Sequence, residues 1–506
     1  MKSSNIYFNL YGVFIIKQYL KLNNYNVDFI DALNKQIDDE FLTLITYLLK
    51  KGNKKMSFEI LIILINVTYT MEGEMLFGKD QKVVENIASF IGNNKNDSTF
   101  VGLGLLLIKN MTNKNALVKQ ILYDYNIIEY FKEIYQKYIL NSDIIENLIL
   151  CLGHFINSRF SKNKYILFSI NIIKSQLNHN NNFQRLTAYI NILYNLAYTK
   201  NCEIIKKMID EEIYKPLMEI FPFDEDNFSK FYDSTKNNDN NNNIIIDEET
   251  MKKKLQNMRI LIIKIFQHLL LLEDNVYIQK LIDSGISQFI NKLLKLSDIK
   301  IIKNTFNCIY LISFGTFGHV SDLYNNNTVS LALNVSKNVY EALNSKNQII
   351  NNNISKKDLL GALREISLAF SILIINSLYE RIVPIIEYEN GLILLLLKDT
   401  LKLIDELPNK RDSISYIFKA FYKILKSFDE NIKEFLEKNG FKEVLEKLLN
   451  NSDEEVSKCS STIIDEFFDD GSNDNNNINI NDIIKDCNFD DNKKNDVDDD
   501  DDEDDD

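Results

Sequence analysis

Four asparagines stand near the ends of apolar helical segments, at intervals that suggest repetition. Asn66, Asn110, Asn195 and Asn376 each follow a run of aliphatic residues with helical spacing. An asparagine amide both donates and accepts hydrogen bonds, so a row of such amides can bind the backbone of an extended peptide whatever its sequence. The row therefore predicts a peptide-binding face. Because asparagine is abundant throughout this chain, coincidence is the competing interpretation.

Two histidines take the matching position in other segments. His154 and His268 lie more than two repeats apart, which is too far for shared metal ligation where each repeat touches only its neighbours. We expect them to line the same face or to be partly buried. No metal site and no cofactor site is predicted. The predicted peptide-binding set is Asn66, Asn110, His154, Asn195, His268 and Asn376.

The segments that carry these residues recur along the chain. Corresponding positions fall at 66, 110, 154, 195, 268, 311, 376, 425 and 465, which we call the marks. Most intervals are 40 to 49 residues and two are 73 and 65, whereas armadillo and HEAT units span roughly 40 to 47 residues. The sequence therefore predicts an all-α fold, a right-handed superhelical armadillo/HEAT-like solenoid of about nine units with a concave binding surface.

The phase within each interval supports this repeat. Gly285, Gly391 and Gly440 follow their marks by 17, 15 and 15 residues, where a helix is expected to end in the left-handed conformation that glycine adopts readily. After Gly285, an apolar stripe that includes Phe289 and Leu293 predicts a second helix, and Asp298 is placed to cap a third. The last unit is expected to begin its third helix with a capping box at 452–455.

The two long intervals contain asparagine-rich stretches, at 224–254 and 325–357, which we expect to be mobile loops. We interpret 1–27 as an N-terminal capping helix, 28–470 as the solenoid and 471–506 as a disordered acidic tail. From 465 to 506, 19 acidic residues oppose three lysines, a charge of −16. The rest of the chain then carries +2, so direct nucleic-acid binding is not expected.

Several classes of protein are disfavoured. Five widely spaced cysteines without a Cys-x-x-Cys pair indicate neither a disulfide framework nor a zinc site, and fit a reducing compartment. No apolar run approaches the roughly 18 residues of a membrane span. No metalloprotease pair, phosphate-binding loop or nucleophile elbow is present. We therefore expect a protein that is not an enzyme, does not enter membranes and is cytoplasmic, nuclear or both.

The pattern resembles the armadillo repeat family and, within it, importin alpha. Phe58, Glu59 and Asn66 resemble the family's first groove-lining segment, Leu152 and Gly153 its third, and 432–470 its closing repeat with an acidic tail after it. The family's Trp-x-x-x-Asn pairs line a peptide groove, but this chain has no tryptophan. The family's basic N-terminal arm is also not visible in residues 1–60.

The resemblance implies a non-enzymatic adaptor that binds a protein or an extended peptide on its concave face, in the manner of importin alpha with nuclear transport cargo. The alternative is a general armadillo-type scaffold for assembling protein complexes, unrelated to nuclear import. The acidic tail either binds a basic partner or only increases solubility, and the second interpretation is the ordinary one for such a segment.

Overall fold

The computed structural model describes eleven parts of the chain, and every regular element within them is a helix. By their internal contacts these residues form two compact units, Met1–Phe221 with Asp226–Lys254, and Pro222–Glu225 with Leu255–Asp506. None of the described helices is long and apolar enough to cross a membrane. The described parts are residues 39–68, 77, 80–113, 115–156, 163–178, 183–221, 248–272, 274–345, 355–407, 411–428 and 430–469.

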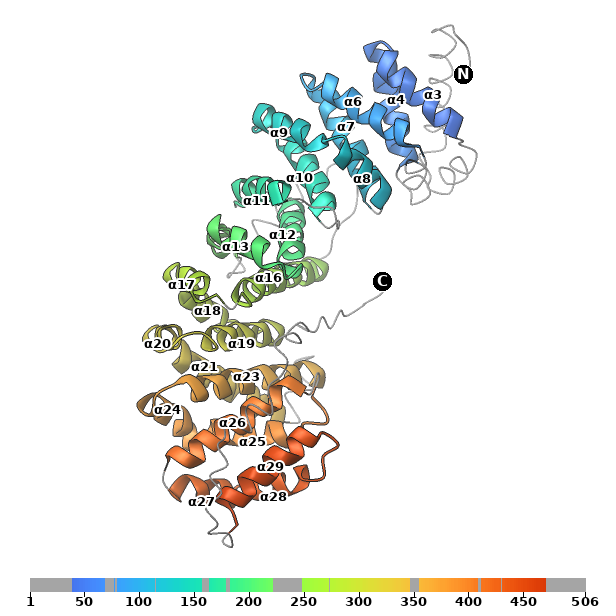
Figure 1. The fold of residues 1–506 in the computed structure, drawn as a ribbon. Coiled ribbons are helices and arrows are strands. Elements are labelled where there is room, and N and C mark those ends of the chain that lie inside the picture. The colour runs from blue at the N-terminus through green and yellow to red at the C-terminus, as the bar shows by residue number, and fades with distance from the viewer. Residues whose placement is uncertain are drawn as a thin grey trace. The chain divides into compact units, whose positions relative to one another are not determined.

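The first unit is a succession of antiparallel helices (Figure 1). Its third helices, meaning the last helix of each repeat, are α4, α7, α10 and α12, which pack on one another in that order. Its described helices are α3 (Asp39–Lys51), α4 (Lys54–Val67), α6 (Gln81–Asn93), α7 (Ser98–Thr112), α8 (Ala116–Asp124), α9 (Ile127–Tyr138), α10 (Ser142–Ile156), α11 (Asn163–Gln176), α12 (Phe183–Tyr198), α13 (Cys202–Asp210) and α14 (Tyr214–Ile220).

The second unit repeats the arrangement, with α16, α19, α23, α26 and α29 as third helices (Figure 1). Residues of α16 from Leu255 onward belong to it. Its described helices are α16 (Glu248–Leu270), α17 (Asn275–Asp283), α18 (Ile286–Leu293), α19 (Ile299–Ser313), α20 (Phe317–Asn325), α21 (Thr328–Asn344), α23 (Lys356–Asn376), α24 (Tyr379–Ile386), the 3₁₀ turn η1 (Tyr388–Asn390), α25 (Leu392–Lys402), α26 (Arg411–Ser427), α27 (Glu430–Lys438), α28 (Phe441–Leu448) and α29 (Glu454–Phe467).

The repeat α17–α18–α19 confirms the predicted three-helix unit. Gly285 has φ +93° and separates α17 from α18, and the Asp298 carboxylate accepts hydrogen bonds from the first amides of α19. Phe289 and Leu293 are buried, and the Phe289 ring packs 5.0 Å from that of Phe266 on α16. The apolar stripe of each helix is thus buried against its neighbours.

The left-handed turn between first and second helices recurs in more repeats than glycine alone indicates. Asn126, Glu212 and Asn327 have φ of 58°, 54° and 60°, and each lies 16 or 17 residues after a mark, where Gly285 lies in its repeat. Asparagine adopts this conformation more readily than most residues with a side chain. The same junction is therefore built with or without glycine.

All nine marks fall in the last turn of a third helix, which confirms the register of the predicted repeat. Six of them lie two residues before the helix ends: Asn110, His154, His268, Leu311, Leu425 and Asp465.

The prediction of a loop at 325–357 is wrong. Most of this stretch is the helix α21, which buries Val329, Leu333 and Val339 on one face. The asparagines at 325–327 end α20 and supply the left-handed turn at Asn327, so they are part of the repeat. Residues 346–354 lie outside the described residues.

Three further predictions concern segment boundaries. The prediction of a loop at 224–254 is wrong for the last seven residues, because α16 begins at Glu248. Residues 222–247 are outside the described parts. The capping box is also placed differently, because Asp453, and not Ser452, accepts the hydrogen bond from the Glu455 amide. The predicted capping helix at 1–27 and tail at 471–506 lie outside the described residues.

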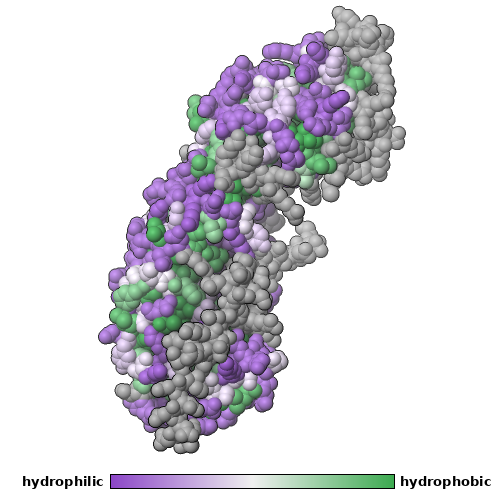
Figure 2. Space-filling view, viewed as in Figure 1, coloured by the Kyte–Doolittle hydropathy of each residue, from purple (hydrophilic) through white to green (hydrophobic). Residues whose placement is uncertain are grey.

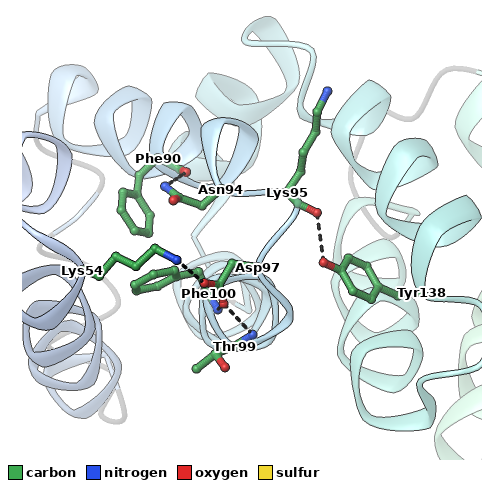
Figure 3. A network of polar contacts seen from close by, with 8 residues as sticks. All are labelled: Lys54, Phe90, Asn94, Lys95, Asp97, Thr99, Phe100 and Tyr138. Carbon is green, nitrogen blue, oxygen red and sulfur yellow. Dashed lines mark hydrogen bonds and ion pairs between the residues drawn. The ribbon is translucent and has the colours of Figure 1, made fainter.

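Polar contacts fix the connection between α6 and α7 to both neighbouring repeats (Figure 3). The Asp97 carboxylate caps α7 by accepting hydrogen bonds from the amides of Thr99 and Phe100. It also forms a 3.3 Å ion pair with Lys54 at the start of α4. On the other side, the Tyr138 hydroxyl of α9 donates to the Lys95 carbonyl at 3.1 Å. The connection is thereby held between two repeats, which sets the spacing of their third helices.

Candidate functional site

The predicted site residues of the first unit lie on consecutive third helices. Asn66, Asn110, His154 and Asn195 are half-buried in the last turns of α4, α7, α10 and α12. The structure therefore brings them into one row. In the second unit, His268 and Asn376 hold the matching positions on their own third helices; His268 is only 3% exposed and Asn376 is half-buried. A side chain as buried as His268 offers no surface to a ligand, so its predicted role at a binding face is wrong.

Hydrogen bonds join the members of this row to the repeat before them. The Asn110 amide nitrogen lies 3.3 Å from the Thr68 hydroxyl, which follows α4, and the Thr112 hydroxyl at the end of α7 lies 3.1 Å from His154 Nδ1. Asn66 instead donates to the Ile62 carbonyl of its own helix at 2.7 Å. The third helices α4, α7 and α10 are thus connected in sequence at their C-terminal ends.

The second unit uses the same device. Asn376 on α23 donates to the carbonyl of Ser313, the last residue of α19, at 2.8 Å. Lys423 on α26 donates at 2.8 Å to the carbonyls of Ile375 and Ser377 around the end of α23. Lysine is well suited to carbonyls at a helix C-terminus, where the partial charge is negative. The sequence interpretation missed Lys423 because it placed the mark two residues later.

Three asparagines of the predicted peptide-binding set, Asn66, Asn110 and Asn376, already have hydrogen-bond partners within the protein. Each donates one amide hydrogen within the chain. However, an asparagine amide has two N–H donors and an oxygen with two lone pairs. The oxygens of these three amides accept no hydrogen bond from another described residue, so part of their capacity remains. Asn195 forms no side-chain hydrogen bond with any described residue.

One turn before the row, the first unit has a stripe of aliphatic side chains. Ile62, Leu106 and Leu150 lie four residues before Asn66, Asn110 and His154 and are half-exposed. These positions correspond to the tryptophans of the family that the sequence resembles. The sequence interpretation treated them as missing tryptophans, although their identical spacing from each mark was a signal of a second row. Together the stripe and the row form a face with apolar and amide surface side by side, which we call the first-unit face.

The charges around the first-unit face nearly balance. Glu59, Lys109, Glu146 and Arg185 are half-buried on its four helices. Arg185 is already paired, at 2.6 Å to the Glu146 carboxylate and 2.8 Å to that of Asp143. This face therefore has no surplus of carboxylates with which to attract a basic ligand.

Burial controls the protonation of His154. Desolvation of the charged imidazolium, together with repulsion from Lys119 and Lys109, lowers the pKa of His154 to about 4. The imidazole is then neutral at pH 7 and serves as a hydrogen-bond partner of Thr112.

The described residues include no group of three His, Cys, Asp or Glu side chains that could hold a metal ion. Cys151 and Cys308 are buried in the core, and burial raises the pKa of the Cys151 thiol to about 12. A thiol that stays protonated at neutral pH is a poor nucleophile. The first-unit face presents amide groups for hydrogen bonding and aliphatic side chains for apolar contact.

Comparison with solved structures agrees with this architecture. An engineered protein is 13% identical and matches with a TM-score of 0.60, covering 92% of this chain and 96% of its own. A structure from work on the interaction between cadherin and beta-catenin is also 13% identical, with a TM-score of 0.50 and 92% of each chain covered. The fold is an armadillo-like solenoid. Identities this low show the fold and leave the ligand undetermined.

A third similar structure is a designed armadillo repeat protein in complex with the peptide (KR)4. It is 21% identical, with a TM-score of 0.40, and covers 59% of this chain and 99% of its own. No protein-family model matches the sequence, and a search of curated proteins finds no match.

Proposed function

We propose that this protein is a non-enzymatic binding scaffold that holds an extended, apolar segment of a partner protein along the first-unit face. The observation that carries the proposal is the register of two rows: half-exposed Ile62, Leu106 and Leu150 lie four residues before Asn66, Asn110 and His154 on three consecutive helices. Solenoids of this kind offer extended surfaces on which successive repeats contribute equivalent positions.

The two rows have different roles in this proposal. The free amide oxygens and remaining N–H groups bind the peptide backbone, which confers affinity without regard to sequence. The aliphatic stripe contacts peptide side chains, which confers a preference for apolar residues. Third helices pack about 8 to 10 Å apart, so a peptide in the polyproline II conformation, which rises about 3.1 Å per residue with three residues per turn, places roughly every third residue on the stripe.

The narrower alternative is importin-alpha-like recognition of nuclear transport cargo, with a protein that works in the cytoplasm and the nucleus. The armadillo-like fold and the asparagines favour it. Recognition of lysine- and arginine-rich signals, however, gains from aromatic shelves and nearby carboxylates. The first-unit face has aliphatic residues in place of the shelves, and its charges are balanced. We therefore favour the general scaffold over the transport adaptor.

A peptide-display selection distinguishes the two. The full chain is immobilised and challenged with a random library of twelve-residue peptides, at low and at physiological salt. The scaffold proposal predicts enrichment of Leu, Ile, Val or Phe at about every third position, with little effect of salt. Enrichment of Lys and Arg that disappears at higher salt supports the transport adaptor and contradicts our proposal. A matched selection on the variant Leu106→Asp is expected to lose the apolar consensus.

A further inference from the structure

The second unit exposes four large apolar side chains on the connections that follow two neighbouring third helices. Phe314 and Phe317 follow α19 and are 40% and 48% exposed, and Leu378 and Tyr379 follow α23 and are 55% and 49% exposed. We call these four residues the aromatic edge. Figure 2 shows one side of the molecule, whose surface is largely hydrophilic with hydrophobic patches between. Single exposed apolar residues are ordinary, whereas a contiguous group marks an interaction site.

Arg381 bridges the two parts of the aromatic edge. The Arg381 guanidinium lies 4.9 Å from the ring centre of Phe317, and the Tyr324 hydroxyl donates to the Arg381 carbonyl at 3.0 Å. These contacts join the connection after α19 to the one after α23. The Tyr379 ring stacks at 4.4 Å on that of Phe428, the residue that follows α26. The edge thus extends over the ends of three third helices.

Cations without a carboxylate partner surround the aromatic edge. Arg381, Lys419 and Lys426 form no ion pair with any residue that the structure describes. Lys419 and Lys426 lie over the rings of Tyr416 and Tyr422 at 5.2 and 5.4 Å, and the Phe314 ring contacts that of Tyr416 at 5.2 Å. Two carboxylates lie nearby and offset these cations in part: Glu380 is exposed, and Glu466 accepts a hydrogen bond from the Tyr422 hydroxyl. An acidic ligand with an apolar side fits this combination.

The chain itself leaves the described structure at the same end of the third helices. The Tyr422 hydroxyl near the end of α26 donates to the Glu466 carboxylate of α29 at 2.9 Å, and its ring lies 5.4 Å from that of Phe467. Lys423 of α26 in turn contacts the end of α23. The ends of α23, α26 and α29 are therefore adjacent, and the last described residue, Asp469, lies at this end.

The sequence beyond Asp469 has the complementary composition. Residues 478–491 contain four aspartates and one lysine, in the sequence ININDIIKDCNFDD. Ile480, Ile483, Ile484 and Cys487 have the i, i+3, i+4, i+7 spacing of one helix face. The end of α23 is two helix spacings from that of α29, about 20 Å. Eleven residues, from Asp469 to Ile480, span up to about 36 Å when extended, so the segment can reach the edge.

We propose that residues 478–491 bind the aromatic edge of the same chain, with the isoleucines against Phe317, Leu378 and Tyr379 and the aspartates toward the cations around them. The segment covers a surface that is otherwise open to partners. A partner with an acidic amphipathic helix then has to displace it. Because the aromatic edge lies on the second unit, this proposal stands or falls independently of peptide binding by the first-unit face.

Intramolecular cross-linking tests the proposal in the full chain, using the native Cys487 of the segment. In a background with Cys202→Ser and Cys459→Ser, Leu378→Cys is paired with Cys487 through a short bismaleimide. The matched control is Leu449→Cys, which is 38% exposed and precedes α29. The length of α29, about 21 Å, separates Leu449 from the tail, so a free tail reaches both sites equally.

Bound to the edge, Cys487 is expected to cross-link to position 378 at least about tenfold faster than to position 449, because binding raises its effective concentration there. Similar rates at the two positions overturn the proposal. The double variant Ile483→Asp and Ile484→Asp changes only the segment and leaves the folded unit intact. It is expected to reduce the rate at position 378 to that of the control, and an unchanged rate contradicts binding through the apolar face.

Discussion

The Asn376 side chain donates a 2.8 Å hydrogen bond to the carbonyl of Ser313, which connects the last turn of α23 to that of α19. In the first unit, threonine hydroxyls take the place of the carbonyl, because Asn110 contacts the Thr68 hydroxyl and His154 contacts that of Thr112. Helix C-termini leave carbonyls without partners inside the helix. In the second unit, Asn376 and Lys423 donate to such carbonyls from the next repeat, so these side chains stabilise the stack of third helices.

Loss of this contact is expected to be measurable. Asn376→Ala removes the hydrogen bond to Ser313 and should cost about 1 kcal/mol in the free energy of unfolding. Asn195→Ala is the matched control, since Asn195 lies at a mark but forms no side-chain hydrogen bond with a described residue. Urea titrations of both variants followed by circular dichroism measure the difference. Equal midpoints for the two variants contradict a structural role for the row.

The core of the central repeat should respond much more strongly. Phe289 is 4% exposed and packs against Phe266, so Phe289→Ala is expected to destabilise the second unit by about 3 to 5 kcal/mol through lost burial and a cavity. Val276→Ala, at a position 66% exposed on the preceding helix, is expected to change stability by less than about 0.5 kcal/mol. A loss below about 1 kcal/mol for Phe289→Ala means that the assigned register is wrong.

His154 makes stability depend on pH. Its pKa is lowered from 6.5 to about 4 in the folded state. As the pH falls from 6.5 toward 4, the unfolded chain binds a proton that the folded chain does not, so stability decreases. The variant His154→Gln has no imidazole at this position, so it lacks this contribution to the pH dependence of stability. Between pH 7 and pH 4.5, the free energy of unfolding should therefore fall by about 2 kcal/mol less in the variant than in the wild type. If the free energy of unfolding depends on pH in the same way in both proteins, burial of the imidazole has no such effect.

Two deletions test which parts of the predicted loops are needed for folding. Removing residues 328–344 deletes α21 with its buried Val329, Leu333 and Val339, and is expected to abolish cooperative unfolding of the second unit. Removing residues 228–247, whose composition predicts a loop, is expected to leave the melting temperature within a few degrees. Calorimetry of both proteins checks this. Loss of the transition in the second deletion indicates that 228–247 packs on the solenoid.

The period and phase of the fold could be predicted because they depend on local patterns. Apolar spacing located the third helices, and glycine located three of the left-handed turns, including Gly285 at φ +93°. Asn126, Glu212 and Asn327 take the same conformation and were missed, because only glycine was used as a signal. Counting asparagine at the fixed distance after each mark would have revealed the turn at Asn327 and corrected the loop assigned to 325–357.

The candidate site was harder to predict because its contacts join residues about 42 or more positions apart. The sequence placed the asparagines in one row. Which of their donors are used depends on how neighbouring helices pack, and that is not a local property. His268 shows the same limit, since nothing in its own segment distinguishes it from the half-buried His154. The aliphatic stripe at Ile62, Leu106 and Leu150 was visible in the sequence but was interpreted as an absence.

Binding of extended apolar peptides by the first-unit face is the proposal on which the function of this protein rests. Its most direct test is calorimetric titration of the full chain with two twelve-residue peptides, one with leucine at every third position among serines and one with lysine there. We predict that only the leucine peptide binds at physiological salt, and that Leu106→Ser with Leu150→Ser weakens it at least about tenfold, since each buried leucine contributes roughly 1.5 to 3 kcal/mol. Binding of the lysine peptide alone, or leucine-peptide binding unchanged in the double variant, contradicts the claim.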